Sequence, residues 1–358
     1  MLRLFLLACA CLSLAGFTYS PAALISDRLV TPGGVSPLLP SADIERMLAR
    51  LPTRSGYATG ADGTRLFWRA IDPGDYHLDY RYLGPADSTN ALPEFSLDFE
   101  APTASSPAPR GTVVLLHGWM MDGNSLLPWS LQLAQSGYRS ISIDLRSHGR
   151  SSEAPSGYGV NEAADVRAVL HALQANGEIE GPLYLLGVSY GAATAIFSAQ
   201  DAGDLPLAGV VALESFDNAG RAIRDMLPHM LSLEPHAWWQ RWTMKWIRWQ
   251  FDAQALETAV TLAGNKIGLD LDEVDVGTAL TSTDTCVLLI HGARDRHVPV
   301  AHGRALASAS TRAHYLELPD EDHLSLPMRL DILAPVVSDW LQRSADTSQA
   351  CPSPLIPA

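Results

Sequence analysis

The chain has 358 residues, of which 47% are hydrophobic and 18% charged, and its formal net charge at pH 7 is −14. This composition excludes a disordered protein and a charge-rich coiled coil. The acidic excess argues against a nucleic-acid partner, because phosphate binding needs a basic footprint.

The N-terminus has the pattern of a secretory signal. Arg3 precedes an apolar run that ends at about Ala15, and small residues follow it. We expect residues 1–22 to be a signal peptide that is cleaved after Ala15, Ser20 or Ala22, which makes the mature protein periplasmic or secreted. The run is shorter than the ~20 apolar residues of a spanning helix, and an uncleaved membrane anchor is the alternative.

The chain has four cysteines, two of which leave with the signal peptide. Of the others, Cys286 opens an apolar run typical of a buried strand, and Cys351 lies near the C-terminus. A bridge between a core strand and a loose tail is geometrically awkward, so we expect two free thiols. Residues 344–358 are expected to form a flexible tail.

The segment before the main pattern should contain one short helix near residues 41–51 and several strands. Strand-like runs flank the turn at Asp62-Gly63, and two more lie near residues 78–83 and 94–99. We expect these N-terminal strands to extend the main sheet.

After Arg110, short apolar runs alternate with helical patterns. The runs are TVVLLH, RSISID, PLYLLG, LAGVVAL, CVLLIH and AHYLEL. Such alternation predicts an α/β fold with a mostly parallel sheet and helices on both faces. About 70 residues of helix and loop separate LAGVVAL from CVLLIH. They predict a small helical cap at about 218–282, inserted into one domain that spans residues 24–343.

The pentapeptide Gly187-Val188-Ser189-Tyr190-Gly191 follows the run PLYLLG and precedes a helix rich in small residues. A serine between two glycines in a strand–turn–helix context is the pattern of a nucleophile elbow. The turn is so tight that it needs glycine on both sides, and it lifts the serine hydroxyl to the edge of the sheet. Ser189 is therefore the candidate nucleophile.

Two backbone amides are candidates for binding a developing oxyanion. His117-Gly118-Trp119 ends the run TVVLLH, upstream of the elbow. The N–H of Trp119 and that of Tyr190, directly after the nucleophile, are in the positions that such donors occupy.

An acid and a base follow the last two strands. Asp295 comes just after CVLLIH, and His323 comes just after AHYLEL. In the order Ser189, Asp295, His323, the imidazole can take the serine proton and return it to the leaving group, while the aspartate orients the imidazole and stabilises its charged form.

Other residues compete for these roles. Glu214 and Asp217 follow LAGVVAL, a second position from which a carboxylate could support the histidine. We expect His148 to orient its own loop, and His291 and His297 to be structural.

The motifs HGW, DLRSHGRSS, GVSYG, HGARDRHVP and DEDH resemble those of α/β-hydrolase-fold serine hydrolases over about residues 57–343. The stretch LDLDEVDVGTAL is similar to one bacterial branch of capped, mostly uncharacterised hydrolases. The family usually has glycine before the catalytic histidine, where this chain has Asp322. With Asp320 and Glu321 beside it, this acidic run would favour protonated His323.

Five of the nine tryptophans lie in HAWWQRWTMKWIRW, and four of them are spaced by 3, 4 and 3 residues, as on one helix face. These four are Trp239, Trp242, Trp246 and Trp249. The helix could pack this face on the catalytic domain. Alternatively, Trp239, Trp242 and Trp246 line the substrate pocket, or the Trp and Arg side chains contact a membrane surface.

The sequence therefore predicts a serine hydrolase that cleaves a carboxylic ester with an apolar acyl part. No metal or organic cofactor is expected, because the sequence has no metal-spaced His/Cys cluster and no dinucleotide fingerprint. A thioesterase or peptidase would use the same triad. A non-catalytic binding or envelope protein on a hydrolase scaffold is a further alternative, which only Asp322 supports.

Overall fold

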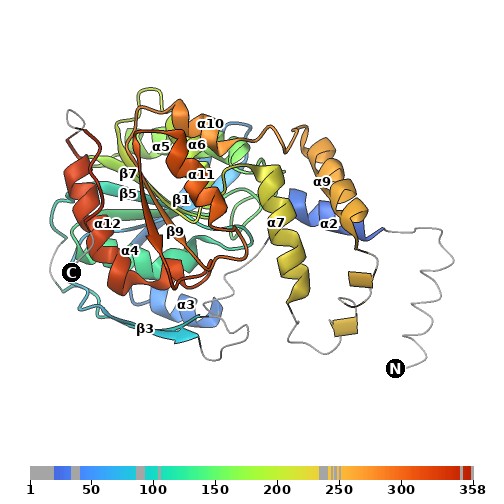
Figure 1. Ribbon diagram of the computed structural model, residues 1–358. Coiled ribbons are helices and arrows are strands. Elements are labelled where there is room, and N and C mark those ends of the chain that lie inside the picture. Colours follow the sequence, from blue (N-terminus) through green and yellow to red (C-terminus); the bar gives the residue numbers. More distant parts are fainter. Residues whose placement is uncertain are drawn as a thin grey trace.

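The computed structural model describes residues 20–33, 41–85, 93–103, 106–233, 241–242, 245, 248–249, 251–346 and 350–355. An eight-stranded sheet with the order β1-β2-β6-β5-β7-β8-β9-β10 forms its centre (Figure 1). The strands are β1 (Thr53–Thr59), β2 (Arg65–Ile71), β5 (Thr112–Leu116), β6 (Arg139–Ile143), β7 (Leu183–Val188), β8 (Leu207–Leu213), β9 (Val287–Gly292) and β10 (Ala313–Leu318).

The six strands β6, β5, β7, β8, β9 and β10 pair in parallel with one another. Only the pairs β1–β2 and β2–β6 are antiparallel. The predicted α/β fold is confirmed. The central strands are buried on both faces: in β5, Val114 and Leu116 join one core cluster, and Val113 and Leu115 join the other. This two-sided burial explains why the strands read as continuous apolar runs.

Helices cover both faces of the sheet. One face carries α5 (Val160–Ala175), α6 (Tyr190–Gln200), α10 (Val276–Thr281) and α11 (Ala301–Ala309). The other face carries α4 (Leu127–Gln135) and α12 (Leu330–Ser344), where Trp129 and Trp340 are fully buried. Two short 3-10 turns lie at Gly123–Leu126 and Leu326–Met328.

The expectation that all N-terminal strands extend the main sheet is wrong for two of them. β3 (Asp79–Pro85) and β4 (Pro93–Asp98) form a separate antiparallel pair. The chain leaves β2 through Tyr76, which is fully buried and whose backbone N–H donates to Gln135 of α4. This crossing carries β3 towards α12, where the Tyr80 hydroxyl donates to the Met328 carbonyl.

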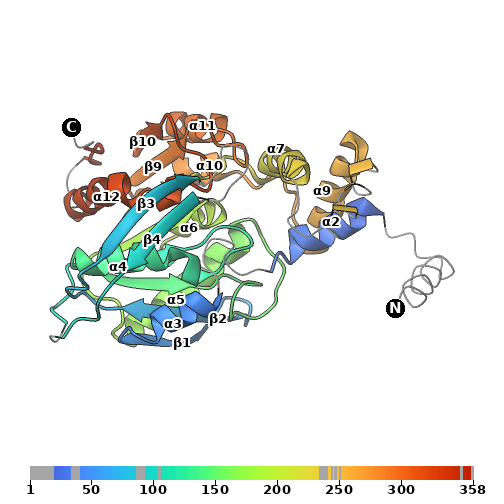
Figure 2. The ribbon, with the colours of Figure 1, turned by 90° about the horizontal axis from the view of Figure 1, so that it is seen from below.

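The region between β8 and β9 contains α7 (Ala219–Ser232), α9 (Ala253–Ile267) and α10. α7 and α9 stand to one side of the sheet, and α2 (Pro21–Val30) lies along α9 (Figures 1 and 2). The short helix expected near residues 41–51 is present as α3 (Ser41–Leu48), but α2 was not expected. Ile25 and Leu29 of α2 are buried, and Lys266 of α9 binds Asp27 and Ser26 at 2.6 Å each.

The expectation of two free thiols is wrong, because Cys286 and Cys351 form a disulfide. Residues 350–355, in the part of the chain expected to be a flexible tail, pack along α12. The Trp340 indole N–H donates to the Pro352 carbonyl, and Arg343 donates to the Ser353 carbonyl, each at 2.8 Å. These bonds hold Cys351 beside the start of β9.

Among the described helices, none is both long and apolar enough to cross a membrane. Residues 1–19, which hold most of the expected signal peptide, lie outside the described residues.

Candidate active site

Ser189 lies on a strained turn between β7 and α6. Its backbone has φ 54° and ψ −113°, a conformation that is rare for a residue with a side chain. A Cβ atom at Gly187 would overlap the Gly191 backbone, and one at Gly191 would overlap the Leu116 carbonyl. The two glycines are therefore required by close backbone packing, and together they force the elbow that presents Ser189.

Asp295 and His323 form a direct pair. Nδ1 of His323 lies 2.6 Å from Oδ2 of Asp295, and the backbone N–H groups of His297 and Val298 donate to Oδ1 of Asp295 at 2.8 Å each. Burial alone would raise the pKa of Asp295, but His323 and His291 act against it through charge and hydrogen bonding and hold that pKa well below its ordinary value. Asp295 is thus an ionised carboxylate aimed at the imidazole.

The three candidates follow β7, β9 and β10, so they all lie at the carboxyl edge of the parallel sheet. In the described part of the chain, the Ser189 hydroxyl makes no hydrogen bond to His323. Such a bond commonly forms or tightens only when substrate is bound.

The loop after β5 passes beside the elbow. A Cβ atom built on Gly118 would lie 3.8 Å from Cβ of Ser189, which places Trp119 next to the nucleophile. The neighbouring Met120 has φ 61°, and its N–H donates to Nε2 of His148 at 3.2 Å. His148 thus bonds to the loop that carries Trp119, which we call the oxyanion loop because the amides of Trp119 and Tyr190 are the oxyanion donors that the sequence predicts.

Two buried histidines support this loop, and the role of His117 was not expected. Nε2 of His117 accepts the Leu145 N–H at 3.0 Å, which links the end of β5 to the loop after β6. Burial lowers the pKa of His117 to about 4 and the pKa of His148 to about 3. Both rings are therefore neutral near pH 7, as an acceptor nitrogen must be.

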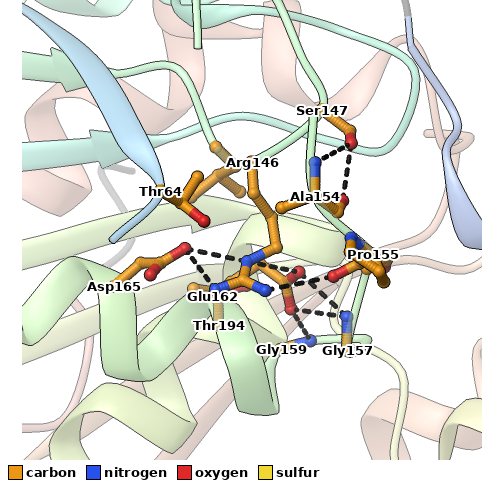
Figure 3. A network of polar contacts seen from close by, with 12 residues as sticks. Thr64, Arg146, Ser147, Ala154, Pro155, Gly157, Gly159, Glu162, Asp165 and Thr194 are labelled. Carbon is orange, nitrogen blue, oxygen red and sulfur yellow. Dashed lines mark hydrogen bonds and ion pairs between the residues drawn. The ribbon is translucent and has the colours of Figure 1, made fainter. Parts of the chain in front are cut away.

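The loop that carries His148 is itself anchored to α5 by a network around Arg146 (Figure 3). The Arg146 guanidinium donates to Asp165 at 2.8 Å, and the Glu162 carboxylate accepts the N–H groups of Gly157 and Gly159. Both acids are buried. This network fixes the base of the loop, and through His148 it reaches the oxyanion loop.

Two more histidines, His297 and His229, lie beside His323. The His297 ring stacks on His323 with 5.1 Å between centroids, and His229 of α7 meets His297 edge-on at 4.7 Å. Burial lowers the pKa of His297 to about 4, and burial also lowers the pKa of His229. The inserted helix α7 therefore contacts the site through a neutral ring.

Glu214 also lies next to His323. Its Oε2 is 3.6 Å from Nδ1 of His323, against 2.6 Å for Asp295, so Asp295 is the direct partner. The alternative acid Asp217 lies elsewhere: its Oδ1 is 2.5 Å from Nδ1 of His302. Glu214, Asp295 and His323 also bring one potential metal-ligand atom each within 4.8 Å of one another. The hydrogen bond between His323 and Asp295 already uses two of these atoms.

The acidic residues before His323 have partners of their own. Oδ1 of Asp322 accepts the N–H groups of Leu324 and Ser325 at 2.9 Å, which closes the turn after β10. Glu321 pairs with Arg329, and Asp320 pairs with Arg294. Asp322 thus has a local structural role, and two of the three negative charges are compensated by arginines.

The tryptophan-rich segment lies mostly outside the described residues, and so do Trp239 and Trp246. Trp242 and Trp249 are described, and 71% and 82% of their surface is exposed. Lys245 lies over the Trp242 ring at 5.5 Å. Trp242 is thus largely exposed, and the alternative in which it lines the substrate pocket stays a prediction.

Two curated proteins match short parts of the chain. An AB hydrolase superfamily protein of Bacillus subtilis, YisY, is 35% identical over 85 residues, which are 24% of this chain and 30% of that protein. The non-heme chloroperoxidase of Burkholderia pyrrocinia is 38% identical over 68 residues, 19% of this chain and 24% of that protein. The chain thus matches less than a third of each curated relative.

Solved structures resemble the whole fold. An esterase of Pyrococcus furiosus has a TM-score of 0.55 at 18% identity, and the match covers 89% of this chain and 96% of that one. An esterase of Exiguobacterium antarcticum has a TM-score of 0.51 at 17% identity, with 80% and 98% covered. At such identities the likeness is one of fold.

A family model described as the alpha/beta hydrolase family matches residues 113–334. This span is more than half of the chain, and it contains the elbow at Ser189, the loop of Asp295 and the loop of His323. The chain therefore belongs to the alpha/beta hydrolase family.

Proposed function

We propose that this protein is a serine hydrolase that cleaves carboxylic esters through an acyl-enzyme on Ser189. The observation that carries the proposal is the hydrogen bond between His323 and the buried Asp295, at the same sheet edge as a serine on a strained elbow. A strained backbone is retained where the surrounding structure holds it, and such positions concentrate at functional sites.

The chemistry has two halves. Oγ of Ser189 bonds to the ester carbonyl carbon while Nε2 of His323 takes the hydroxyl proton, and His323 then gives this proton to the departing alcohol as the C–O bond breaks. In the second half, water attacks the acyl carbon while His323 takes a proton from the water, and His323 then gives this proton to Oγ of Ser189 as the bond between Oγ and the acyl carbon breaks and the carboxylic acid leaves. Asp295 stabilises the imidazolium in both halves.

The amides of Trp119 and Tyr190 would bind the oxyanion of each tetrahedral intermediate. Removing one such donor typically costs about 3 kcal/mol of transition-state stabilisation. His148 and the Arg146 network keep the loop of Trp119 in place, because the backbone of Met120 is bonded to His148.

An apolar acyl group suits the surroundings of the nucleophile. The Trp119 side chain, next to the elbow, is partly buried and packs against the large apolar core cluster on one face of the sheet. Esterases and an enol-lactonase are among the solved structures with this fold. An ester is therefore our first choice over a thioester or an amide.

The test is labelling by a fluorophosphonate probe, together with hydrolysis of an ester, a thioester and an amide that share one acyl group. We expect wild type and Ser308→Ala, an exposed serine on α11, to be labelled and active, and Ser189→Ala to be neither. Faster cleavage of the thioester or amide would reassign the leaving group. No labelling of folded protein at pH 7 to 9 would contradict the triad and favour a binding protein.

We also propose that the protein is exported, with the disulfide between Cys286 and Cys351 as support, because disulfides persist in oxidising compartments. Ser20 caps α2, and Pro21 and Ala22 are buried in its first turn. Cleavage after Ala22 would remove all three, and cleavage after Ser20 would remove the cap, so we expect the cut after Ala15. N-terminal sequencing of protein recovered from the periplasm or medium checks this, and a mature chain that begins at Ala23 would contradict it.

A further inference from the structure

Glu214 is an unusual residue for its surroundings. It directly follows β8, its side chain is fully buried, and its backbone has φ 55°. Within the described part of the chain, neither oxygen of its carboxyl group meets a donor at ordinary hydrogen-bond geometry, although the backbone N–H of Gly292 is near enough to favour the ionised form. A buried carboxyl group without a well-formed hydrogen bond is costly, so its position calls for an explanation beyond packing.

The carboxyl group faces the catalytic pair. Oε2 of Glu214 lies 3.6 Å from Nδ1 of His323, the nitrogen that Asp295 already binds at 2.6 Å. The N–H of Glu214 donates to the Ile290 carbonyl of β9 at 2.8 Å, so the backbone that carries this side chain is fixed. Two carboxyl groups from neighbouring strands therefore converge on one imidazole nitrogen.

The charges in this pocket do not balance if both carboxyl groups are ionised. The loop after β9 contributes Asp295, and the loop after β10 contributes Glu321, Asp322 and His323. Glu321 is compensated by Arg329. Asp295 has two imidazoles beside it, those of His323 and His291, whereas in the described part of the chain the carboxyl group of Glu214 is paired only with His323. Burial first, and then the charges of Asp295 and Asp322, raise the pKa of Glu214 well above its ordinary value.

We propose that Glu214 is a latent second acid of the site, a positioning residue that holds a proton while Asp295 is ionised and ionises to support His323 when the Asp295 charge is lost. This inference rests on the proposed function of the triad. Without the Asp295 charge, the largest of the repulsions that raise the pKa of Glu214 is removed, and the imidazolium formed in the reaction attracts the Glu214 carboxylate. A movement of less than ~1 Å would bring its oxygen within ordinary hydrogen-bond distance of Nδ1.

The test compares four full-length proteins in the hydrolysis of p-nitrophenyl butyrate: wild type, Glu214→Gln, Asp295→Ala and the double variant. Because Gln is neutral and has nearly the shape of a protonated Glu, we expect Glu214→Gln to keep its kcat/KM within ~3-fold of wild type. Asp295→Ala should lose about 10²- to 10⁴-fold. The double variant should lose at least ~10-fold more, although Glu214→Gln alone costs little.

The pH profile separates this role from simple packing. The residual activity of Asp295→Ala should rise with pH through an ionisation that is missing in the double variant, because only the single variant keeps a carboxyl group that can ionise. If Asp295→Ala does not fold, the pair Asp295→Asn and Asp295→Asn/Glu214→Gln, which preserves the shape of the side chain, should show the same order and the same pH difference.

Two outcomes would overturn the inference. One is a double variant as active as Asp295→Ala within ~2-fold, which would mean that Glu214 gives no support. The other is a Glu214→Gln variant as impaired as Asp295→Ala, which would make Glu214 a working acid already in the wild type. Failure of the triad itself would be recognised separately, because Ser189→Ala would then keep its activity.

Discussion

The disulfide between Cys286 and Cys351 joins the start of β9 to the end of the chain. β9 ends just before the loop that positions Asp295, and the segment around Cys351 is also bound by His314 of β10, whose Nε2 lies 2.9 Å from the Cys351 carbonyl. The two strands that precede Asp295 and His323 are thus joined at the opposite edge of the sheet by one short segment.

We expect loss of this disulfide to lower the free energy of unfolding. The bond closes a loop with a sequence separation of 65 residues, for which the chain-entropy relation gives about 4 kcal/mol. Cys351→Ser should therefore lower Tm, and a reductant should lower the Tm of wild type to a similar value. The control is Cys286→Ser/Cys351→Ser, whose Tm should not respond to reductant. A wild-type Tm that is unaffected by full reduction would contradict a stabilising role.

The neutral state of His148 should appear in the pH dependence of stability. The pKa of His148 is about 3 in the folded protein, below the ordinary 6.5. Below pH 6.5, His148 is therefore protonated in the unfolded chain but stays neutral in the folded protein. This group therefore stabilises the fold above pH 6.5 and loses that contribution as the pH falls. His148→Gln, which cannot titrate, should gain about 2 to 3 kcal/mol relative to wild type between pH 6.5 and 4.5.

The comparison must be between variants, because Asp122 and Asp165 act in the opposite direction. The pKa of each carboxyl group is raised to about 6, mainly by burial. Between pH 6 and 4 the folded protein therefore takes up these protons more readily than the unfolded chain, which favours the folded state as the pH falls. Urea unfolding of wild type and His148→Gln at both pH values measures the difference. His148→Ala should show the same trend from a lower absolute stability. A difference that does not change with pH would show that His148 is not held neutral.

The parts of the site that could be predicted from the sequence are those set by local pattern. Ser189 stands between glycines on a strand–helix turn, and Asp295 and His323 each follow an apolar strand, so their meeting at one sheet edge follows from parallel pairing. Glu214 was considered only as a substitute for Asp295. The sequence could not show that both carboxyl groups reach one nitrogen, because that depends on the spacing of β8 and β9.

The features that escaped prediction depend on where distant segments pack. The disulfide forms because Trp340 and Arg343 bind the tail beside β9, which no spacing of the two cysteines could reveal. The separation of β3 from the main sheet follows from the buried crossing at Tyr76. The packing of α2 on α9 likewise joins residues more than 200 positions apart, as the bond between Lys266 and Ser26 shows.

The helix α2 should contribute measurably to the stability of the inserted region, because its inner face is buried against α9. Leu29 is 1% exposed, whereas Leu24 on the same helix is 43% exposed. We expect Leu29→Ala to cost about 3 kcal/mol and Leu24→Ala less than about 0.5 kcal/mol. Urea unfolding of both variants checks this. Equal effects of the two substitutions would mean that α2 does not pack on α9 as described.

Gly191 should not tolerate replacement by alanine. A Cβ atom there would overlap the carbonyl of Leu116 and that of His117, which belong to β5 and the start of the oxyanion loop. We expect Gly191→Ala to abolish fluorophosphonate labelling and to lower the free energy of unfolding by at least about 3 kcal/mol, because backbone atoms of a central strand cannot move aside easily.

The control is Gly277→Ala in α10, where the nearest atom, 3.2 Å away, is a carboxylate oxygen of Asp275. That variant should stay within about 1 kcal/mol of wild type and remain fully labelled, because a helix tolerates alanine and a side chain can adjust. A labelled, stable Gly191→Ala protein would show that the elbow is not packed as described.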